Sequence, residues 1–165
     1  DICLIYNGAK SKNRMDKKYL FNEQLIAPCG MNCGLCVAYQ FSKHDLNKHG
    51  FNRRYCPGCV PRAKNCTFMA NHCELLKKGL VRFCFECGKF PCERLKRLDQ
   101  RYSTKYGMSM IENLKHIKEQ GIDSFLFDQE KRWECKDCGT AICCHTRSCL
   151  LCDTDLSTYK KHKSK

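Results

Sequence analysis

Residues 135–152 read CKDCGTAICCHTRSCLLC, and the spacing of their cysteines predicts a metal-binding hairpin. Cys135 and Cys138 form one C-x2-C pair, Cys149 and Cys152 form another, and ten residues separate the two pairs. The two thiolates of such a pair lie in one tight turn and can point at a single ion. This order of ligands is typical of a zinc ribbon, and we expect the four cysteines to bind one ion.

The loop between the two pairs contains three further side chains that are able to bind zinc. Cys143, Cys144 and His145 follow one another there, and each could replace one of the four cysteines as a ligand. The other interpretation is that they are buried thiols and a surface imidazole. Gly139, directly after the first pair, suits the tight turn because glycine adopts unusual backbone conformations at little cost.

Cysteine is abundant in the whole chain, with 17 among 165 residues. Without cysteine, roughly a third of the residues are ordinary apolar ones, which is few for a well-buried core. Metal ions or disulfides therefore help to hold the fold. An odd cysteine count, five C-x2-C pairs and the lack of a secretory signal pattern favour metal in a reducing compartment. We expect a cytoplasmic location, with disulfides in a secreted protein as the alternative.

A second group of four cysteines occupies the middle of the chain. Cys56, Cys59, Cys66 and Cys73 have the spacing C-x2-C-x6-C-x6-C, which predicts a second tetrahedral site. The CPGC sequence of the first pair also resembles a thioredoxin-like redox motif. That motif follows a buried strand, whereas the preceding residues KHGFNRRY have no strand pattern, so metal binding is favoured.

Two further groups have three cysteines each and lack a fourth ligand nearby. They are Cys29, Cys33 and Cys36, and Cys84, Cys87 and Cys92. The fourth ligand could come from the neighbourhood of the other group, from His72 or from water. Three thiolates with an open position would let a substrate bind the metal, whereas a ligand from a distant loop would close the site. A closed site is favoured.

Residues 93–132 contain no cysteine and have the pattern of helices. Leu95, Leu98 and Tyr102 recur at the spacing of one helical face. Ser109 stands three residues before a glutamate, as in a capping box that begins a second helix. We expect three helices here, and we expect them to supply most of the apolar core.

Glycine and aspartate mark the junction between the second and third of these helices. Gly121 is expected to end the second helix, and Asp123 to cap the third, which runs towards Trp133. Outside this segment, residues 37–49 (VAYQFSKHDLNKH) also predict a helix, directly after the first cysteine group.

The predicted fold class is a small metal-stabilised α+β protein. We expect mostly short helices and irregular cysteine-rich turns, with a C-terminal zinc-ribbon-like element, and one compact unit from residue 25 to 152. The segments are an N-terminal extension (1–26, of which 1–14 are interpreted as non-native), a cysteine-rich metal-binding region (27–92), a helical segment (93–132), the ribbon (133–152) and a basic tail (153–165).

The motifs LIAPCGMNCGLCVAY, CPGC, FCFECGKFPC and RWECKDCGTAICCHTRSCLLC, in this order, resemble a cysteine-rich prokaryotic family known as domain of unknown function 3795. The resemblance runs from about Leu25 to Cys152 and implies no established activity. It implies that twelve cysteines occupy the cysteine positions of the family, namely Cys29, Cys33, Cys36, Cys56, Cys59, Cys84, Cys87, Cys92, Cys135, Cys138, Cys149 and Cys152. The loop that contains Cys66 is longer than the family pattern.

The formal net charge of +13 resembles that of nucleic-acid-binding proteins, but it counts every thiol as neutral. One zinc ion with four thiolates carries a net charge of about −2, so metal centres offset part of this excess. The best candidate for a nucleic-acid-binding face is basic and has two tyrosines beside it. It consists of Arg94, Arg97, Arg101 and Lys105, near Tyr102 and Tyr106. A solvated helix face is the favoured interpretation.

Three functions are compatible with these observations. The first is a zinc-stabilised binding or adaptor module without catalysis, which a protein partner would recognise. The second is an iron–sulfur redox or sensor protein, because clustered thiolates also hold such clusters. The third is a zinc-dependent nucleic-acid-binding protein. The sequence contains no acid–base dyad, catalytic triad, phosphate-binding loop or dinucleotide fingerprint, which argues against an enzyme.

Overall fold

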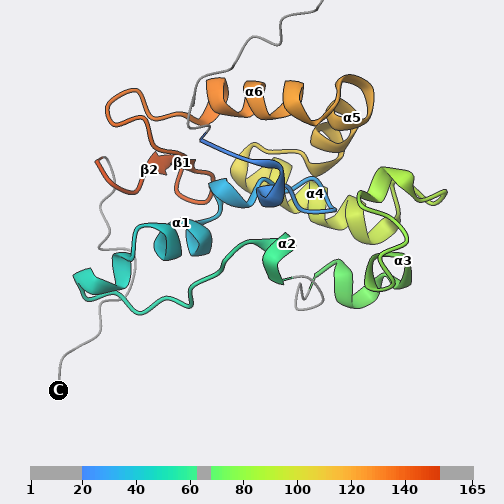
Figure 1. The fold of residues 1–165 in the computed structure, drawn as a ribbon, viewed down its shortest axis with the longest axis horizontal. Helices are drawn as coiled ribbons and strands as arrows, with labels where there is room; N and C mark the ends of the chain where they lie inside the picture. Colours follow the sequence, from blue (N-terminus) through green and yellow to red (C-terminus); the bar gives the residue numbers. More distant parts are fainter. Residues whose placement is uncertain (1–19, 63–67, 153–165) are drawn as a thin grey trace, which may run out of the picture.

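The computed structural model describes residues 20–62 and 68–152, which form mostly short helices with a small two-stranded hairpin near the C-terminal end (Figure 1). Cys66, the tail at 153–165 and the stretch interpreted as non-native at 1–14 lie outside the described residues. Among the described residues, no helix has the length and apolar character needed to cross a membrane.

The helices and strands follow one another along the chain as a series of short elements. The α-helices are α1 (Val37–Lys43), α2 (Cys59–Arg62), α3 (Glu74–Lys77), α4 (Glu93–Tyr106), α5 (Met110–Gln120) and α6 (Ile122–Trp133). The strands are β1 (Ile142–Cys143) and β2 (Ser148–Cys149). Single 3-10 turns lie at Glu23–Leu25, Cys33–Leu35, Leu46–His49, Ala70–His72 and Cys84–Glu86.

The three helices predicted between residues 93 and 132 are present, and α5 packs against both α4 and α6. The Ser109 side chain accepts a hydrogen bond from the Glu112 N–H at 3.0 Å, which confirms that Ser109 caps α5. Its hydroxyl donates to the Asp99 carboxylate of α4 at 2.7 Å. The cap residue therefore also joins α4 to α5.

The junction between α5 and α6 differs from the prediction at one residue. Gly121 ends α5 as expected, but it is also the N-cap residue of α6, so the expectation that Asp123 caps that helix is wrong. Gly121 has φ +85°, a conformation open to glycine, and it turns the chain within one residue. Asp123 lies in the first turn of α6, where a negative charge is favourable to the helix dipole.

The helix predicted at residues 37–49 is interrupted. It divides into α1 and the 3-10 turn Leu46–His49, because Asp45 adopts a left-handed conformation with φ +48°. Aspartate is one of the few non-glycine residues that tolerate this conformation. The interruption lets Leu46 and Phe51 fold back towards Phe41 in a small second core.

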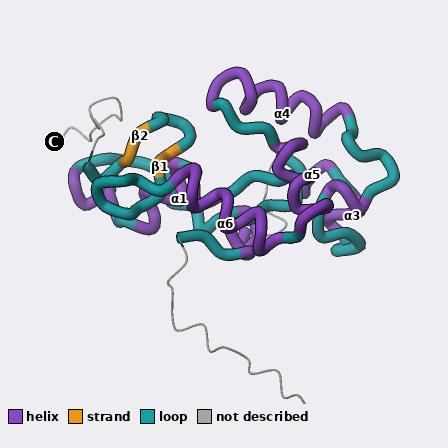
Figure 2. Tube along the Cα trace, turned by 90° about the horizontal axis from the view of Figure 1, so that it is seen from above, coloured by secondary structure: helices purple, strands orange, loops and turns teal. Residues whose placement is uncertain are grey.

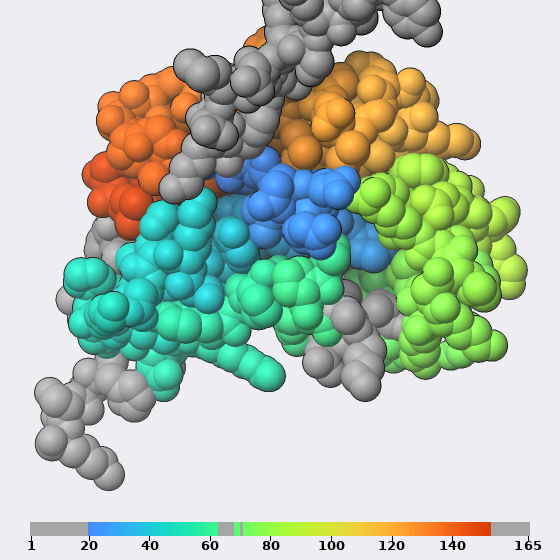
Figure 3. Space-filling view, viewed as in Figure 1, coloured from blue at the N-terminus to red at the C-terminus, as the bar shows by residue number. Residues whose placement is uncertain are grey.

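The main core is formed by two segments that are far apart in the sequence. Phe21, Leu25 and Leu35 are buried against residues of the helical segment such as Leu95 and Leu114. Figure 3 shows the N-terminal part of the described chain, in blue, lying between the cysteine-rich region and the helices. The expectation that residues 93–132 supply most of the apolar core is therefore wrong, because residues 20–36 contribute a comparable share.

Buried amide side chains hold this N-terminal segment against the helices. Asn113 of α5 donates to the Gly30 carbonyl at 2.8 Å. Asn32, which has no exposed surface, accepts a hydrogen bond from the Gly34 N–H at 3.0 Å and donates to Gln129 of α6 at 3.4 Å. Because a buried amide without a partner is costly, these bonds determine where the turn between the first cysteines lies.

Gly30 lies so close to α5 that a side chain has no space there. It has φ +84°, and a Cβ atom would lie 2.5 Å from the Met110 carbonyl oxygen and 2.9 Å from Leu114 Cγ. Gly50 has nearly the same φ, +83°, but a Cβ atom there would meet nothing within 4 Å. The two glycines therefore separate the effect of backbone conformation from that of close packing.

We expect Gly30→Ala to lower the free energy of unfolding by about 2–5 kcal/mol, from backbone strain and overpacking together. The matched control Gly50→Ala is expected to cost only about 1–2 kcal/mol, because it adds strain without a clash. Urea unfolding followed by far-UV circular dichroism measures both. Equal losses in the two variants would show that the close approach of Gly30 to α5 contributes nothing.

Candidate metal centre

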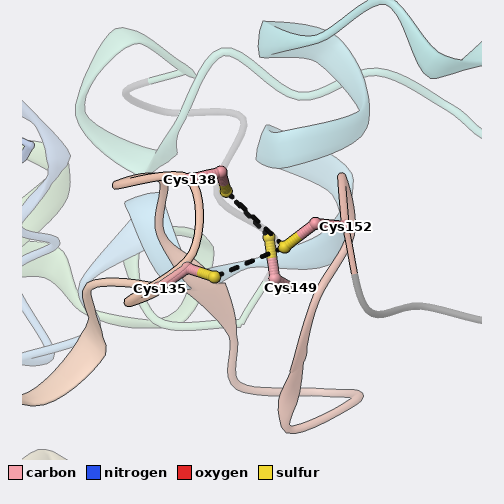
Figure 4. Close-up of side chains that lie close together, drawn as sticks. All are labelled: Cys135, Cys138, Cys149 and Cys152. Carbon is pink, nitrogen blue, oxygen red and sulfur yellow. Dashed lines mark hydrogen bonds between the residues drawn. The ribbon is translucent and has the colours of Figure 1, made fainter.

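The C-terminal hairpin places the four cysteines of residues 135–152 around one point. β1 and β2 pair in antiparallel register, with Ile142 opposite Cys149. The Cys135 and Cys152 sulfurs are 3.4 Å apart, those of Cys138 and Cys149 3.5 Å, and those of Cys138 and Cys152 3.7 Å (Figure 4). All four sulfurs lie within 4.8 Å of one another.

These separations have the size that a single zinc ion requires. In a tetrahedral site with Zn–S bonds of about 2.3 Å, neighbouring sulfurs are about 3.8 Å apart. A disulfide brings its sulfurs to about 2.05 Å, well below the observed 3.4–3.7 Å. The arrangement therefore fits four thiolates around one ion, and the donor set is the soft, all-sulfur set of structural zinc sites.

The turn after the first pair has the geometry of a metal-binding knuckle. The Cys135 N–H donates to the Thr140 carbonyl at 2.7 Å, and the Gly139 N–H donates to the Cys135 carbonyl at 2.9 Å. Gly139 has φ +71°, which confirms the interpretation that this turn uses a conformation favouring glycine. The turn brings Cys135 and Cys138 to the same side of the hairpin (Figure 4).

Hydrogen bonds to sulfur shift the thiol pKa values of the second pair, Cys149 and Cys152. Burial raises the pKa of the Cys149 thiol, but hydrogen bonds from the Thr140 hydroxyl and the Leu151 and Cys152 N–H groups outweigh it and bring the pKa to about 6. The hydrogen bond with Cys135 is the main reason that the pKa of Cys152 is raised. Donors that favour a thiolate also favour metal binding, since the thiolate is the form that coordinates.

Thr140 is a part of this centre that the sequence analysis did not identify. Its Oγ1 atom lies 3.0 Å from the Cys138 sulfur and 3.3 Å from the Cys149 sulfur. A hydroxyl hydrogen bond to a coordinating sulfur orients that ligand and lowers its basicity. The only signal in the sequence is its place directly after Gly139, which is too general to assign the role.

Cys143 lies outside the group of four because the hairpin alternates its faces. Successive residues of a strand point to opposite sides, and opposed residues of a strand pair share a side. Cys149 is opposite Ile142, so Cys143 faces the other way. There it has no exposed surface and packs with Phe41 and Leu150 in the second core.

Cys144 and His145 attach the hairpin to the helices instead of joining the four sulfurs. The Cys144 N–H donates to the Leu35 carbonyl at 3.0 Å, and burial is the main cause that raises the pKa of its thiol. The His145 ring has its centroid 4.7 Å from that of Tyr106 and 5.8 Å from that of Tyr102. Burial lowers the pKa of His145, so its ring is neutral at pH 7.

Cys56 and Cys59, the first pair of the middle group, lie against the group that contains Cys33 and Cys36. The Cys59 N–H donates to the Cys33 sulfur at 3.2 Å, and the Cys36 thiol interacts electrostatically with that of Cys56. The two C-x2-C turns, 33–36 and 56–59, therefore face each other, an arrangement that the sequence analysis did not identify. Spacing along the chain carries no signal for it, because some twenty residues separate the two turns.

Cys73 lies with the other three-cysteine group. Together with Cys84, Cys87 and Cys92 it lines one cavity, which His72 also borders. Burial, and after it the neighbouring thiols of Cys29, Cys92, Cys73 and Cys87, raise the pKa of Cys84 to about 12. Within residues 20–62 and 68–152, only the hairpin cysteines bring three or more metal-binding atoms within 4.8 Å of each other.

Of the basic side chains predicted to form a face on α4, one packs against the protein and the others are exposed to solvent. The Arg94 guanidinium lies over the Phe68 ring at 4.7 Å and its Nε atom donates to the Phe68 carbonyl. Arg97, Arg101 and Lys105 are exposed. Tyr102 is half-buried and its hydroxyl lies 3.4 Å from His145 Nε2, so it supports the hairpin and is not offered to a ligand.

Comparison with known proteins finds one family model that matches the N-terminal part of the described chain. Residues 25–97 match the family model described as a protein of unknown function, DUF3795. The match covers 73 of the 165 residues, less than half of the chain. The DUF3795 match confirms the resemblance over residues 25–97, which include the cysteines from Cys29 to Cys92. It stops before the hairpin, and no curated protein or solved structure matches the chain.

We expect Cys143→Ala to leave the metal content of the protein unchanged. It removes one buried sulfur from the second core, so the free energy of unfolding should fall by roughly 1 kcal/mol. Elemental analysis of the purified variant and its urea unfolding curve measure the two effects. A loss of one metal equivalent per chain would contradict the ligand set of Cys135, Cys138, Cys149 and Cys152.

Proposed function

We propose that this protein is a zinc-stabilised, non-catalytic binding module, with one zinc ion held by Cys135, Cys138, Cys149 and Cys152. The observation that carries the proposal is the convergence of these four sulfurs at the separation that tetrahedral zinc requires. Four protein thiolates fill the coordination sphere and leave no position for a substrate. Such closed sites are structural, whereas catalytic zinc keeps one position for water or substrate.

The place of the hairpin in the fold supports a structural role for the ion. Its inward face contributes Cys143 and Leu150 to the second core, where they pack with Val37 and Phe41 of α1. A two-stranded hairpin is at best marginally stable alone. The free energy of zinc binding would therefore be folding free energy for this whole end of the molecule.

Replacing one ligand should show this coupling. We expect Cys138→Ser to lose one zinc per chain and to lower the melting temperature by on the order of 10 °C, since loss of a structural metal is a large destabilisation. Cys138 is exposed, so the substitution itself removes little packing. Elemental analysis, thermal unfolding and the fluorescence of Trp133, the single tryptophan of the chain, provide the measurements.

Asp137→Ser is the matched control, because Asp137 is exposed in the same turn and provides no sulfur. It should retain the zinc and the melting temperature of the parent protein. Unchanged zinc content in Cys138→Ser would contradict the proposed ligand set. Iron and sulfide lost by Cys138→Ser, in place of zinc, would instead favour the iron–sulfur alternative at the hairpin.

A second candidate function, nucleic-acid binding, gains support from one contact. Arg147 of the hairpin donates from Nη2 to the Lys105 carbonyl at the end of α4, at 2.9 Å. It continues the row of exposed Arg97, Arg101 and Lys105 from α4 onto the hairpin. A row of cations at this spacing could follow a phosphate backbone, and the hairpin would hold its last member in place.

The double variant Arg97→Ala/Arg101→Ala tests this second candidate. Binding of single-stranded and double-stranded DNA and RNA should weaken, and the slope of log K against log salt should fall by about two in magnitude. Lys115→Ala/Lys118→Ala, which removes two exposed cations from α5, is the control and should change neither quantity at this face. Absence of binding by the parent protein at low salt would reject the candidate.

A further inference from the structure

Four cysteines from three separate segments line one cavity at the end of the molecule opposite the hairpin. Cys73 is the N-cap residue of α3, Cys84 begins the 3-10 turn Cys84–Glu86 and Cys87 follows it, and Cys92 is the N-cap residue of α4. The cavity has a volume of about 610 Å³. Figures 1 and 2 show α3 and the hairpin at opposite ends of the long axis, so this cavity is separate from the hairpin centre.

The backbone around Cys84 and Cys87 has the form of a second knuckle. The Cys87 N–H donates to the Cys84 carbonyl at 3.2 Å, which closes a tight turn between the two sulfurs. The Lys89 N–H donates to the Cys87 sulfur at 3.4 Å. A backbone donor aimed at sulfur stabilises negative charge there, which a neutral thiol does not need.

This turn is fixed in position by bonds on both sides. The Cys84 N–H donates to the Pro28 carbonyl at 2.9 Å, which ties the turn to the first cysteine group. The Glu86 carboxylate accepts from the Arg82 N–H at 2.8 Å and from the Phe83 N–H at 3.3 Å. Cys84 and Cys87 are thus held on a rigid turn, as metal ligands must be.

The four thiols are neighbours, and the rest of the cavity is mostly apolar. Cys84 is close enough to Cys29, Cys92, Cys73 and Cys87 to interact with each of them electrostatically, and of these four only Cys29 does not line the cavity. Leu76, Val81, Phe90 and Leu95 are among the other side chains that line the cavity. Lys89 and Arg94 also line it, and a metal ion among the four sulfurs would offset the charge of their thiolates.

We propose that Cys73, Cys84, Cys87 and Cys92 form a second thiolate-ligated metal centre, with the spacing C-x10-C-x2-C-x4-C. Cys73 is the fourth ligand that the group of Cys84, Cys87 and Cys92 lacks locally. The centre is independent of the zinc proposed for the hairpin, since the two lie at opposite ends of the molecule and share no residue.

The spacing of the sulfurs favours an iron–sulfur cluster over a single zinc ion. No three of these sulfurs all lie within 4.8 Å of one another, a criterion that, in the described residues, the hairpin cysteines meet. A single ion draws its four sulfurs to about 3.8 Å. In a [4Fe–4S] cluster each cysteine binds a different iron atom, so the cysteine sulfurs are further apart than around one ion.

Cysteine alkylation of the native full-length protein, purified without oxygen, tests the centre. Cys73, Cys87 and Cys92 are half-buried, so they would react if no metal held them. We expect Cys73, Cys87 and Cys92 to be protected by at least tenfold until a chelator removes the metal, as read by mass spectrometry of the peptides. Equal rates before and after metal removal would overturn the proposal.

Metal analysis of two variants assigns the metal to this site. Cys87→Ser should lose iron and acid-labile sulfide while it keeps the hairpin zinc, and Cys138→Ser should do the reverse. Zinc lost by Cys87→Ser, in place of iron, would support the centre and reject the cluster. An unchanged metal content in Cys87→Ser would overturn the centre. If Cys87→Ser does not fold, the alkylation of the native protein decides alone.

Discussion

The convergence of four cysteine sulfurs at the hairpin determines how the C-terminal end of this protein is built. Cys135, Cys138, Cys149 and Cys152 face one point, so the residues that alternate with the second pair must face the opposite way. That opposite face packs on α1 and completes the second core. A hairpin with strands of two residues has few ladder hydrogen bonds, so these sulfurs and the packing beneath them set its position.

The main core also holds irregular backbone in position, but it does so with buried amide side chains in place of cysteine sulfurs. Its apolar residues come from a turn-rich segment at 20–36, which has no long regular element, and from the helices α4, α5 and α6. Hydrogen bonds of buried amide side chains join these two parts, as backbone hydrogen bonds join neighbouring strands in a sheet. Asn32, Asn113 and Gln129 join irregular backbone to the helices, and Gly30 permits the backbone to approach α5 closely.

Thiolates that bind a metal ion would also lower the net positive charge of the protein. The four thiolates and one divalent ion proposed for the hairpin would carry a net charge of about −2, which would offset part of the formal net charge of +13. The remaining exposed cations on α4 and Arg147 form a row that meets the hairpin. Since Arg94 and Tyr102 are used for packing, this row is narrower than the basic face that the sequence pattern indicates.

The sequence by itself determined the features that depend on a few adjacent residues. The C-x2-C pairs with Gly139 predicted a hairpin that gathers four cysteines, and Ser109 and Gly121 predicted both ends of α5, because tight turns and helix ends have few conformations. The sequence did not predict the break of the helix at Asp45, or that Gly121 both ends α5 and begins α6. At these positions local signals compete with packing that only the folded chain provides.

Only the tertiary structure decided which cysteines meet. The facing turns of Cys33 and Cys59, and the place of Cys73 beside Cys84, depend on how separate segments pack, and spacing along the chain has no information on that. Strand alternation turns Cys143 away from the four hairpin cysteines, although its place between the two pairs made it a possible substitute ligand. The physical reason is the same in each case. The conformation of a turn depends on its own few residues, whereas the packing of buried side chains decides which other segments lie beside it.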